Sequence, residues 1–158
     1  GRKRIMKFTP EGRFVLGWGG EGDGPGRFME PVGLAVSDEG EVYVADTANH
    51  RVQIFTPEGQ FVRQFKVFGW QDFHTQPFIE VMPDGSVVVT DSAANRVAQY
   101  DSNGTLRRSW GGPGKERGNV MAPHGVAVAQ DGSVLVVDTN NHRVQLFRLL
   151  PEKMPSPP

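Results

Sequence analysis

Short runs of apolar residues alternate with turn-forming residues throughout the segment from Pro31 to Lys66. Its four apolar runs are Val32–Val36, Val42–Ala45, Val52–Phe55 and Phe61–Phe65. Runs of about 4–7 residues that are rich in Val, Phe and Tyr and bounded by Gly, Pro and Asn predict β-strands. The connections between these runs are so short that neighbouring strands must be antiparallel. The segment is therefore predicted to form a four-stranded antiparallel meander.

The rest of the chain contains partial copies of this segment. An Asp recurs at positions 46, 91 and 138, at intervals of 45 and then 47 residues, and an Arg follows five residues after each Asp. A glycine and an aromatic position keep similar intervals: Gly12, Gly59 and Gly104, and Trp18, Phe65 and Trp110. A four-strand unit that recurs at roughly this period is typical of β-propeller blades. The sequence thus predicts an all-β chain built from successive blades.

The copies share a motif with a known family. The motif runs from Pro-x-Gly and two small apolar residues, through Val-x-Val-x-Asp-Thr, to Asn-His-Arg-Val-Gln-(Ile/Leu)-Phe, and it resembles the NHL repeat. Residues 46–54 (DTANHRVQI) and 138–146 (DTNNHRVQL) carry the resemblance best, and residues 91–97 (DSAANRV) are a looser copy. The Gly-rich residues 19–31 resemble the family's inter-blade segment. The resemblance extends to about Leu150 and implies the fold; it leaves the function open, because NHL propellers serve as enzymes, RNA binders and protein-binding platforms.

The copies are incomplete at both ends of the chain. Residues 1–20 match only the end of a blade, residues 31–66 and 76–110 each match a whole blade, and residues 123–150 match a blade without its outer strand. Residues 151–158 form a Pro-rich tail. Because a propeller ring needs about four to eight blades, we expect an incomplete ring of about three blades. The chain is predicted to be the C-terminal half of a six-bladed propeller, or else two copies complete a ring.

Composition excludes some function classes. At 158 residues the chain is long enough for one domain with a core, and its net charge of −1 provides no overall field that attracts nucleic acid or an anionic membrane. No apolar run approaches the roughly 18–20 residues of a transmembrane segment, and no signal-peptide pattern opens the chain. The chain has no Cys, which excludes disulfides, thiol catalysis and thiolate metal sites. Its cellular compartment is left open.

The recurring Asp and Arg residues flank one short loop in each blade. The pairs are Asp46 with Arg51, Asp91 with Arg96, and Asp138 with Arg143. A carboxylate at this position can accept hydrogen bonds from backbone N–H groups of the loop, and a guanidinium can pair with it in a fork. A catalytic site normally occurs once, whereas each copy that spans this loop has the pair. The pairs are therefore predicted to be structural.

The crossing between the second and third blades departs from the Gly-rich pattern. Residues 66–77 read KVFGWQDFHTQP and bring Phe68, Trp70, Phe73 and His74 into one connection. In a propeller this crossing lies on the face that bears the entrance to the central channel. Aromatic and His side chains on a loop of a rigid scaffold suit recognition. The crossing is thus a candidate partner-binding surface; the alternative is that its bulky side chains fill a gap between blades.

Two further residues are predicted to lie near the central channel. Glu80 aligns with Ala35 and Ala127 of the innermost strands, and a carboxylate there must be hydrated, paired or bound to a cation, because burial of an unpaired charge is costly. His124 opens the innermost strand of the next blade. Together with His74, Glu80 and His124 form a candidate ligand site. Glu80 is expected to face water in the channel. The alternative is that the three residues form a metal or acid–base site. No spaced metal motif matches, so no catalytic residue, metal ligand or cofactor is assigned.

Three functions remain open from the sequence. The regular repeats, the incomplete ring and the lack of a unique polar cluster favour a binding or scaffold module that engages a protein partner or a second copy. The first alternative is a metal-dependent lyase or hydrolase, since residues 123–128 (PHGVAV) are loosely similar to the amidating lyases of this fold. The second is RNA binding, as in the NHL domains of TRIM-type ubiquitin ligases. Acidic residues are interleaved with Arg27, Lys115 and Arg117 on the crossings, and this charge pattern argues against RNA.

Overall fold

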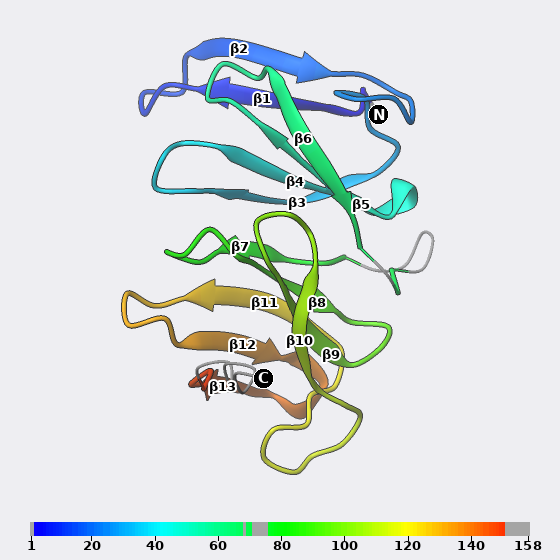
Figure 1. The fold of residues 1–158 in the computed structure, drawn as a ribbon, viewed down its shortest axis with the longest axis vertical. Helices are drawn as coiled ribbons and strands as arrows, with labels where there is room; N and C mark the ends of the chain where they lie inside the picture. The colour runs from blue at the N-terminus through cyan, green and yellow to red at the C-terminus, as the bar shows by residue number, and fades with distance from the viewer. Residues whose placement is uncertain (1, 68, 71–75, 151–158) are drawn as a thin grey trace, which may run out of the picture.

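A computed structural model describes residues 2–67, 69–70 and 76–150 (Figure 1). This part of the chain contains thirteen β-strands and two short 3-10 helices. The strands are β1 (Arg4–Phe8), β2 (Phe14–Gly19), β3 (Pro31–Val36), β4 (Val42–Asp46), β5 (Arg51–Phe55), β6 (Phe61–Lys66), β7 (Ile79–Val81), β8 (Val87–Asp91), β9 (Arg96–Tyr100), β10 (Leu106–Gly111), β11 (Pro123–Val128), β12 (Val134–Asp138) and β13 (Arg143–Phe147), and the helices are η1 (Thr47–Asn49) and η2 (Thr139–Asn141). In these ranges no helix is long and apolar enough to cross a membrane.

The strands form four separate antiparallel sheets, which we call blades 1 to 4. Blade 1 is β1-β2, blade 2 is β3-β4-β5-β6, blade 3 is β7-β8-β9-β10, and blade 4 is β11-β12-β13. Within a blade, each strand pairs with the next strand in the sequence, so blades 2 to 4 are meanders and the described part of blade 1 is a hairpin. The predicted all-β fold of successive four-stranded meanders is therefore confirmed.

Side-chain alternation builds a separate core on each side of an inner blade. In β4, Val42 and Val44 belong to the core between blades 1 and 2, whereas Tyr43 and Ala45 belong to the core between blades 2 and 3. A third core lies between blades 3 and 4. Because successive residues point to opposite faces and both faces are covered, the middle strands β4 and β8 are buried along their whole length and are nearly continuous apolar runs.

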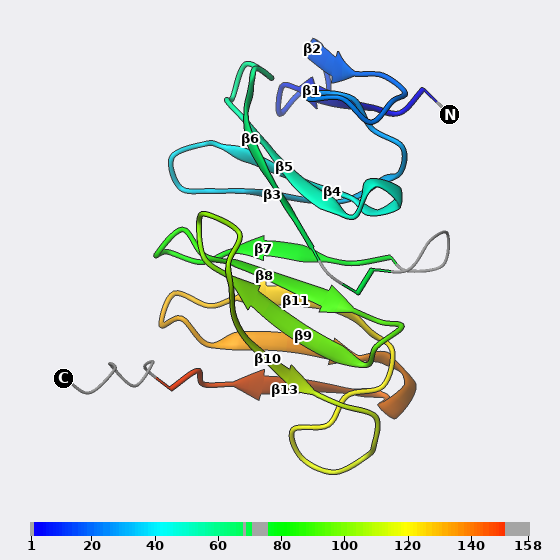
Figure 2. The same cartoon turned by 45° about the vertical axis from the view of Figure 1, so that its right-hand side comes forward.

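Blades 1 and 4 lie at opposite ends of the stack, as Figures 1 and 2 show. The described chain is therefore an arc, and the predicted incomplete ring is confirmed. Within the described residues, no further blade packs on the outer faces of blades 1 and 4. That this arc is half of a six-bladed propeller stays a prediction.

The first strand of each of blades 2, 3 and 4 lies innermost in the arc. The short strand β7 contacts both β3 and β11. This contact brings together the ends of three strands that are far apart in the sequence.

Candidate functional site

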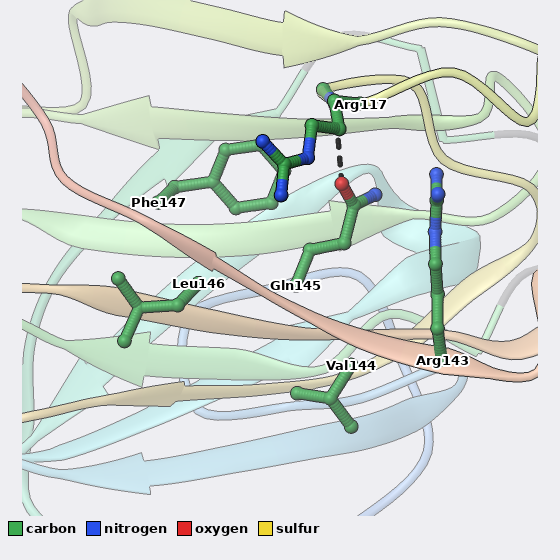
Figure 3. Close-up of a pocket in the computed structure, with 7 residues that line it drawn as sticks. Arg117, Arg143, Val144, Gln145, Leu146 and Phe147 are labelled. Atoms are coloured by element: carbon green, nitrogen blue, oxygen red, sulfur yellow. Dashed lines mark hydrogen bonds between the residues drawn. The ribbon is translucent and has the colours of Figure 1, made fainter.

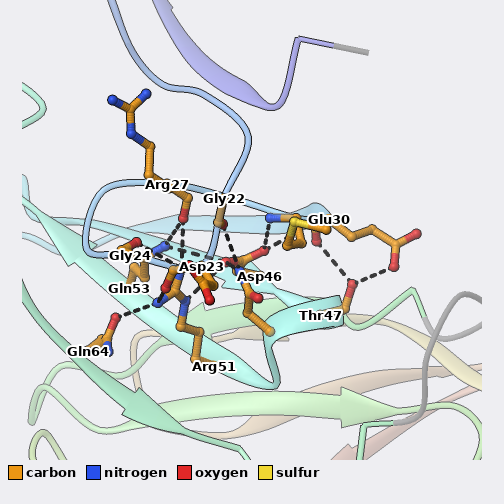
Figure 4. Close-up of polar contacts among 12 residues, drawn as sticks. Gly22, Asp23, Gly24, Arg27, Glu30, Asp46, Thr47, Arg51, Gln53 and Gln64 are labelled. Carbon is orange, nitrogen blue, oxygen red and sulfur yellow. Dashed lines mark hydrogen bonds and ion pairs between the residues drawn. The ribbon is translucent and has the colours of Figure 1, made fainter.

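Blade 2 contains a buried polar network around the ion pair of Asp46 and Arg51 (Figure 4). Oδ1 of Asp46 accepts hydrogen bonds from the backbone N–H groups of Met29 and Glu30, at 2.9 and 3.0 Å. Its Oδ2 accepts from Nδ2 of Asn49 at 2.7 Å and from Nε of Arg51 at 3.1 Å. These bonds replace the water that the fully buried carboxylate has lost.

The guanidinium of Arg51 extends this network to the Gly-rich crossing that leads from blade 1 to blade 2. Its Nη atoms donate to the backbone carbonyl oxygens of Asp23, Gly24 and Arg27. Nη1 also donates to Oε1 of Gln64 on β6, at 2.9 Å. The ion pair thus fastens the crossing to the blade.

Blade 4 repeats this network around Asp138 and Arg143. Nε of Arg143 donates to Oδ2 of Asp138 at 2.7 Å, and its Nη atoms donate to three carbonyl oxygens of the crossing from blade 3. Burial raises the pKa of Asp138, but hydrogen bonds from the Met121 N–H, from Asn141 and from Arg143 outweigh it, so the pKa lies below its ordinary value. The geometry in both blades is that of a clamp on backbone carbonyls.

Blade 3 has the pair without the Gly-rich crossing. Nε of Arg96 lies 3.1 Å from Oδ2 of Asp91, whose Oδ1 accepts from the N–H of Ala94 at 3.1 Å. Gly69, in the crossing from blade 2, lies so close that an added Cβ would overlap the Arg96 guanidinium. This glycine lets the backbone of a different crossing approach the same pair.

Trp70 is buried in the core between blades 2 and 3, in the same hydrophobic cluster as Phe65 and Tyr100. Its indole Nε1 is buried and has no hydrogen-bond partner among the residues that the structure describes. This position suits the gap-filling alternative for Trp70. The other members of the proposed binding surface, Phe68, Phe73 and His74, lie outside the described residues, and their role stays a prediction.

Glu80 lines a cavity of about 200 Å³ where the ends of the innermost strands meet. The cavity is lined by Val36, Ser37, Asp38, Glu80, Val81, Met82, Pro83, Val128, Ala129 and Gln130. Burial raises the pKa of the Glu80 carboxyl above its ordinary value. Sequence reasoning missed Asp38 and Gln130, because each lies in a turn after an innermost strand and only the curvature of the arc brings them near Glu80.

His124 lies away from the Glu80 cavity. It is the second residue of β11, whereas the last residue of that strand, Val128, lines the cavity. Nδ1 of His124 is 2.9 Å from the carbonyl oxygen of Ala122 and 3.1 Å from Oγ1 of Thr139. In the described ranges, the structure forms no group of three His, Asp or Glu side chains that could hold a metal ion.

The outer face of blade 4 exposes aliphatic side chains whose equivalents in blade 2 are buried. Val144 and Leu146 of β13 align with Val52 and Ile54 of β5. Val52 and Ile54 are 0% exposed between blades 2 and 3, whereas Val144 and Leu146 are 61% and 55% exposed. The same pattern has opposite burial because blade 3 covers this face of blade 2, whereas no described strand covers it in blade 4. Aligning β13 with β5 would have identified these two residues from the sequence.

A groove of about 600 Å³ follows β13 (Figure 3). It is lined by Arg117, Gly118, Arg143, Val144, Gln145, Leu146 and Phe147. Figure 3 shows Val144 and Leu146 directed to one side of β13, and Gln145 and Phe147 to the other. In blades 2 and 3 the corresponding strand is flanked by an outer strand, β6 or β10.

Meander sheets stacked face to face around an arc, with Asp–Arg pairs that fasten blades 2 and 4 to the crossings before them, define a repeat chain of the β-propeller class. The sequence model of the NHL repeat matches residues 28–55 and 121–147, which contain the Asp–Arg pairs of blades 2 and 4. The chain belongs to the NHL-repeat family, which confirms the resemblance found in the sequence.

Relatives share this region within much longer proteins. Protein brain tumor of Drosophila melanogaster is 34% identical over 126 aligned positions, and the match covers 77% of this chain and 12% of that protein. Peptidyl-glycine alpha-amidating monooxygenase A of Xenopus laevis is 34% identical over 162 aligned positions, which are 91% of this chain and 16% of that protein. E3 ubiquitin-protein ligase TRIM32 of Homo sapiens is 28% identical over 147 aligned positions, and the match covers 85% of this chain and 21% of that protein. The chain thus spans between 12% and 21% of the length of these relatives.

Solved structures share the fold at low sequence identity. A structure of streptogramin B lyase has a TM-score of 0.63 and 17% identity, and covers 96% of this chain and 50% of that one. The structure of U3-55K has a TM-score of 0.57 and 18% identity, with coverages of 92% and 46%. At these identities the similarity shows the fold alone.

Proposed function

We propose that this chain is a binding or scaffold module whose open blade faces engage a protein partner or a second copy of the chain. The observation that carries the proposal is the exposure of Val144 and Leu146, whose equivalents in blade 2 are buried between blades. Contiguous aliphatic surface of this kind marks an association site.

The two open faces are of complementary kinds. Blade 4 exposes the face that would receive a following blade. Blade 1 exposes the opposite kind of face, because Met6 and Phe8 of β1 are about half exposed and Phe8 aligns with Phe55, which faces the preceding blade. A propeller segment of the same family could therefore add at either end.

Solution mass and partner capture test this proposal. The double variant Val144→Lys with Leu146→Lys places two charges on the open face without disturbing a buried core. We expect it to lose self-association or partner capture, whereas the control Gln60→Lys with Asn103→Lys, at exposed positions elsewhere, retains it. A wild-type chain that stays a monodisperse monomer, unfolds cooperatively and captures no partner would count against the proposal.

The amidating monooxygenase relative favours a second candidate function, a metal-dependent lyase or hydrolase, because that match extends over 91% of this chain. His74 and His124 are the side chains that would supply nitrogen ligands. Metal analysis of the purified chain, with His74→Ala and His124→Ala as comparisons, tests this candidate. No bound metal at any loading removes it.

A further inference from the structure

The Glu80 cavity is built by the innermost strands of blades 2, 3 and 4. Its lining comes from the ends of β3, β7 and β11 and from the turns that follow them. Figure 1 shows these three turns on one side of the arc. The walls of the cavity therefore do not include the exposed residues of β1 or β13.

Two carboxylates that line this cavity have no counter-ion. Within the described ranges, neither Glu80 nor Asp38 forms an ion pair or accepts a hydrogen bond on its side chain. Two nearby carboxylates, those of Glu41 and Asp84, are each paired with an arginine, at 3.4 and 2.7 Å. Among the described residues, no Lys, Arg or His lines the cavity. The cavity thus holds negative charge that this part of the chain leaves uncompensated.

The repeat itself does not require a carboxylate at this place. The positions that correspond to Glu80 in the innermost strands of blades 2 and 4 are Ala35 and Ala127. A residue that maintains the shape of a blade recurs from copy to copy, as the Asp–Arg pairs do. Glu80 occurs in blade 3 alone among these three blades, and this singularity favours a ligand over a structural role.

Much of the remaining lining is aliphatic. Val36, Val81 and Val128 come from the three strand ends, and Met82 follows β7. A calcium ion takes six to eight oxygen ligands, and in the described part of the chain no three His, Asp or Glu side chains are grouped to hold a metal ion. Carboxylates beside an aliphatic wall suit a cation that carries its own alkyl chain.

We propose that the Glu80 cavity binds the primary ammonium group of an alkylamine, with Glu80 and Asp38 as acceptors and the alkyl chain against the aliphatic wall. An ammonium group has three donors and no acceptor, and its hydrogen bonds to ionised carboxylates are stronger than those between neutral groups. The cavity of about 200 Å³ equals the volume of about six or seven water molecules, at about 30 Å³ each. This volume accommodates an ammonium group with a short alkyl chain.

The state of Glu80 without a ligand agrees with this assignment. Burial raises the pKa of the Glu80 carboxyl, because the carboxylate has lost water and has gained no partner in exchange. A bound ammonium group would supply the missing charge and hydrogen bonds. The cost of burying the carboxylate would then fall when the ligand binds.

A titration with n-butylammonium tests the site. The full 158-residue chain is labelled with carbon-13 at its methionine methyl groups, and one of its five Met residues, Met82, lines the cavity. We expect the Met82 methyl signal to shift saturably at pH 7 while the signals of the other four Met residues stay in place. n-Butanol has the same chain length without the charge and should leave the Met82 signal unchanged.

A matched pair of variants separates the cavity from general attraction by acidic residues. Glu80→Gln keeps the size of the side chain but removes its charge, and it should weaken binding by about ten-fold or more, as expected for a lost charged hydrogen bond. Glu39→Gln removes the same charge from an exposed residue beside Asp38 that does not line the cavity, and it should bind like the wild type. Equal weakening in the two variants, an unshifted Met82 signal or equal binding of n-butanol would overturn the proposal.

Two further probes identify the cation and its source. Calcium chloride that shifts the Met82 signal at lower concentration than n-butylammonium would assign the cavity to a metal ion and overturn the proposal. Nα-acetyl-lysine methylamide carries the ammonium group as a protein side chain does. Its binding at least as tightly as n-butylammonium would support a Lys side chain as the source, whereas binding of n-butylammonium alone would support a free amine.

The amine site goes beyond the proposed function, because Val144 and Leu146 do not line the cavity. A chain that binds no amine but still associates through these two residues would overturn the amine site alone.

Discussion

The two copies of the Asp–Arg clamp allow the effect of burial on an ion pair to be measured within one molecule. Asp46→Ala removes five hydrogen bonds and leaves the guanidinium of Arg51, with a side chain only 7% exposed, without its counter-ion. Breaking a buried pair in this way costs about 3–5 kcal/mol. Arg51 keeps four other oxygen acceptors, so we expect a loss of about 3 kcal/mol in the free energy of unfolding.

Asp138→Ala removes the matching carboxylate in blade 4. The Arg143 side chain is 30% exposed, so water can solvate the guanidinium that remains. We expect a smaller loss of about 1–2 kcal/mol, in the range of a lost charged hydrogen bond.

Urea unfolding followed by circular dichroism and Trp fluorescence measures both losses. For a chain of this size about 1 kcal/mol corresponds to about 2–4 °C in Tm, so Asp46→Ala should lower Tm by about 6–12 °C. Equal losses in the two variants, or a larger loss for Asp138→Ala, would refute the reasoning that the greater exposure of Arg143 weakens the clamp of blade 4.

Three further changes have expected outcomes. Gly104→Ala should lower the urea midpoint more than Gly132→Ala; both glycines have positive φ, but an added Cβ would overlap Phe65 at position 104 and meets nothing within 4 Å at position 132. Equal midpoints would contradict this. The folded pKa of Asp138 lies below its ordinary 3.8, so Asp138 stabilises the fold above about pH 4 and the contribution is lost as pH falls further. Asp138→Asn should therefore flatten stability against pH below about pH 4, and an unchanged slope would count against the assignment. Glu80 affects the pH dependence of stability in the opposite direction. Burial raises its pKa, so the ionised form of Glu80 lowers the free energy of unfolding at neutral pH. Glu80→Gln should raise the urea midpoint at pH 7 and leave it unchanged near pH 4; a lower midpoint at pH 7 would show that Glu80 is stabilised as an anion.

The strands and their order were predictable because their signals are local. The apolar runs between Pro31 and Lys66 became β3 to β6, and the strand counts of the four blades agree with the copies found in the sequence. The least regular copy was the hardest to place. The innermost strand of blade 3 is only Ile79–Val81, and it follows the crossing in which the Gly-rich pattern is lost.

The candidate site was less predictable, because it depends on which segments the arc brings together. Glu80 was recognised as unusual, but Asp38 and Gln130 joined it through curvature alone. Glu80 and His124 were expected near one entrance. The structure instead places His124 near the start of β11 and the Glu80 cavity at the end of that strand.

Alternation, turn residues and repeat spacing were enough to define the blade, since a meander is held together by neighbours in the sequence. Local sequence did not determine whether a blade face is buried. RVQIF and RVQLF carry the same local information, yet Ile54 is enclosed and Leu146 is open to solvent. The difference arises because blade 3 packs on the face that carries Ile54, whereas no described blade packs on the face that carries Leu146. Burial between blades therefore depends on how whole blades are arranged in space.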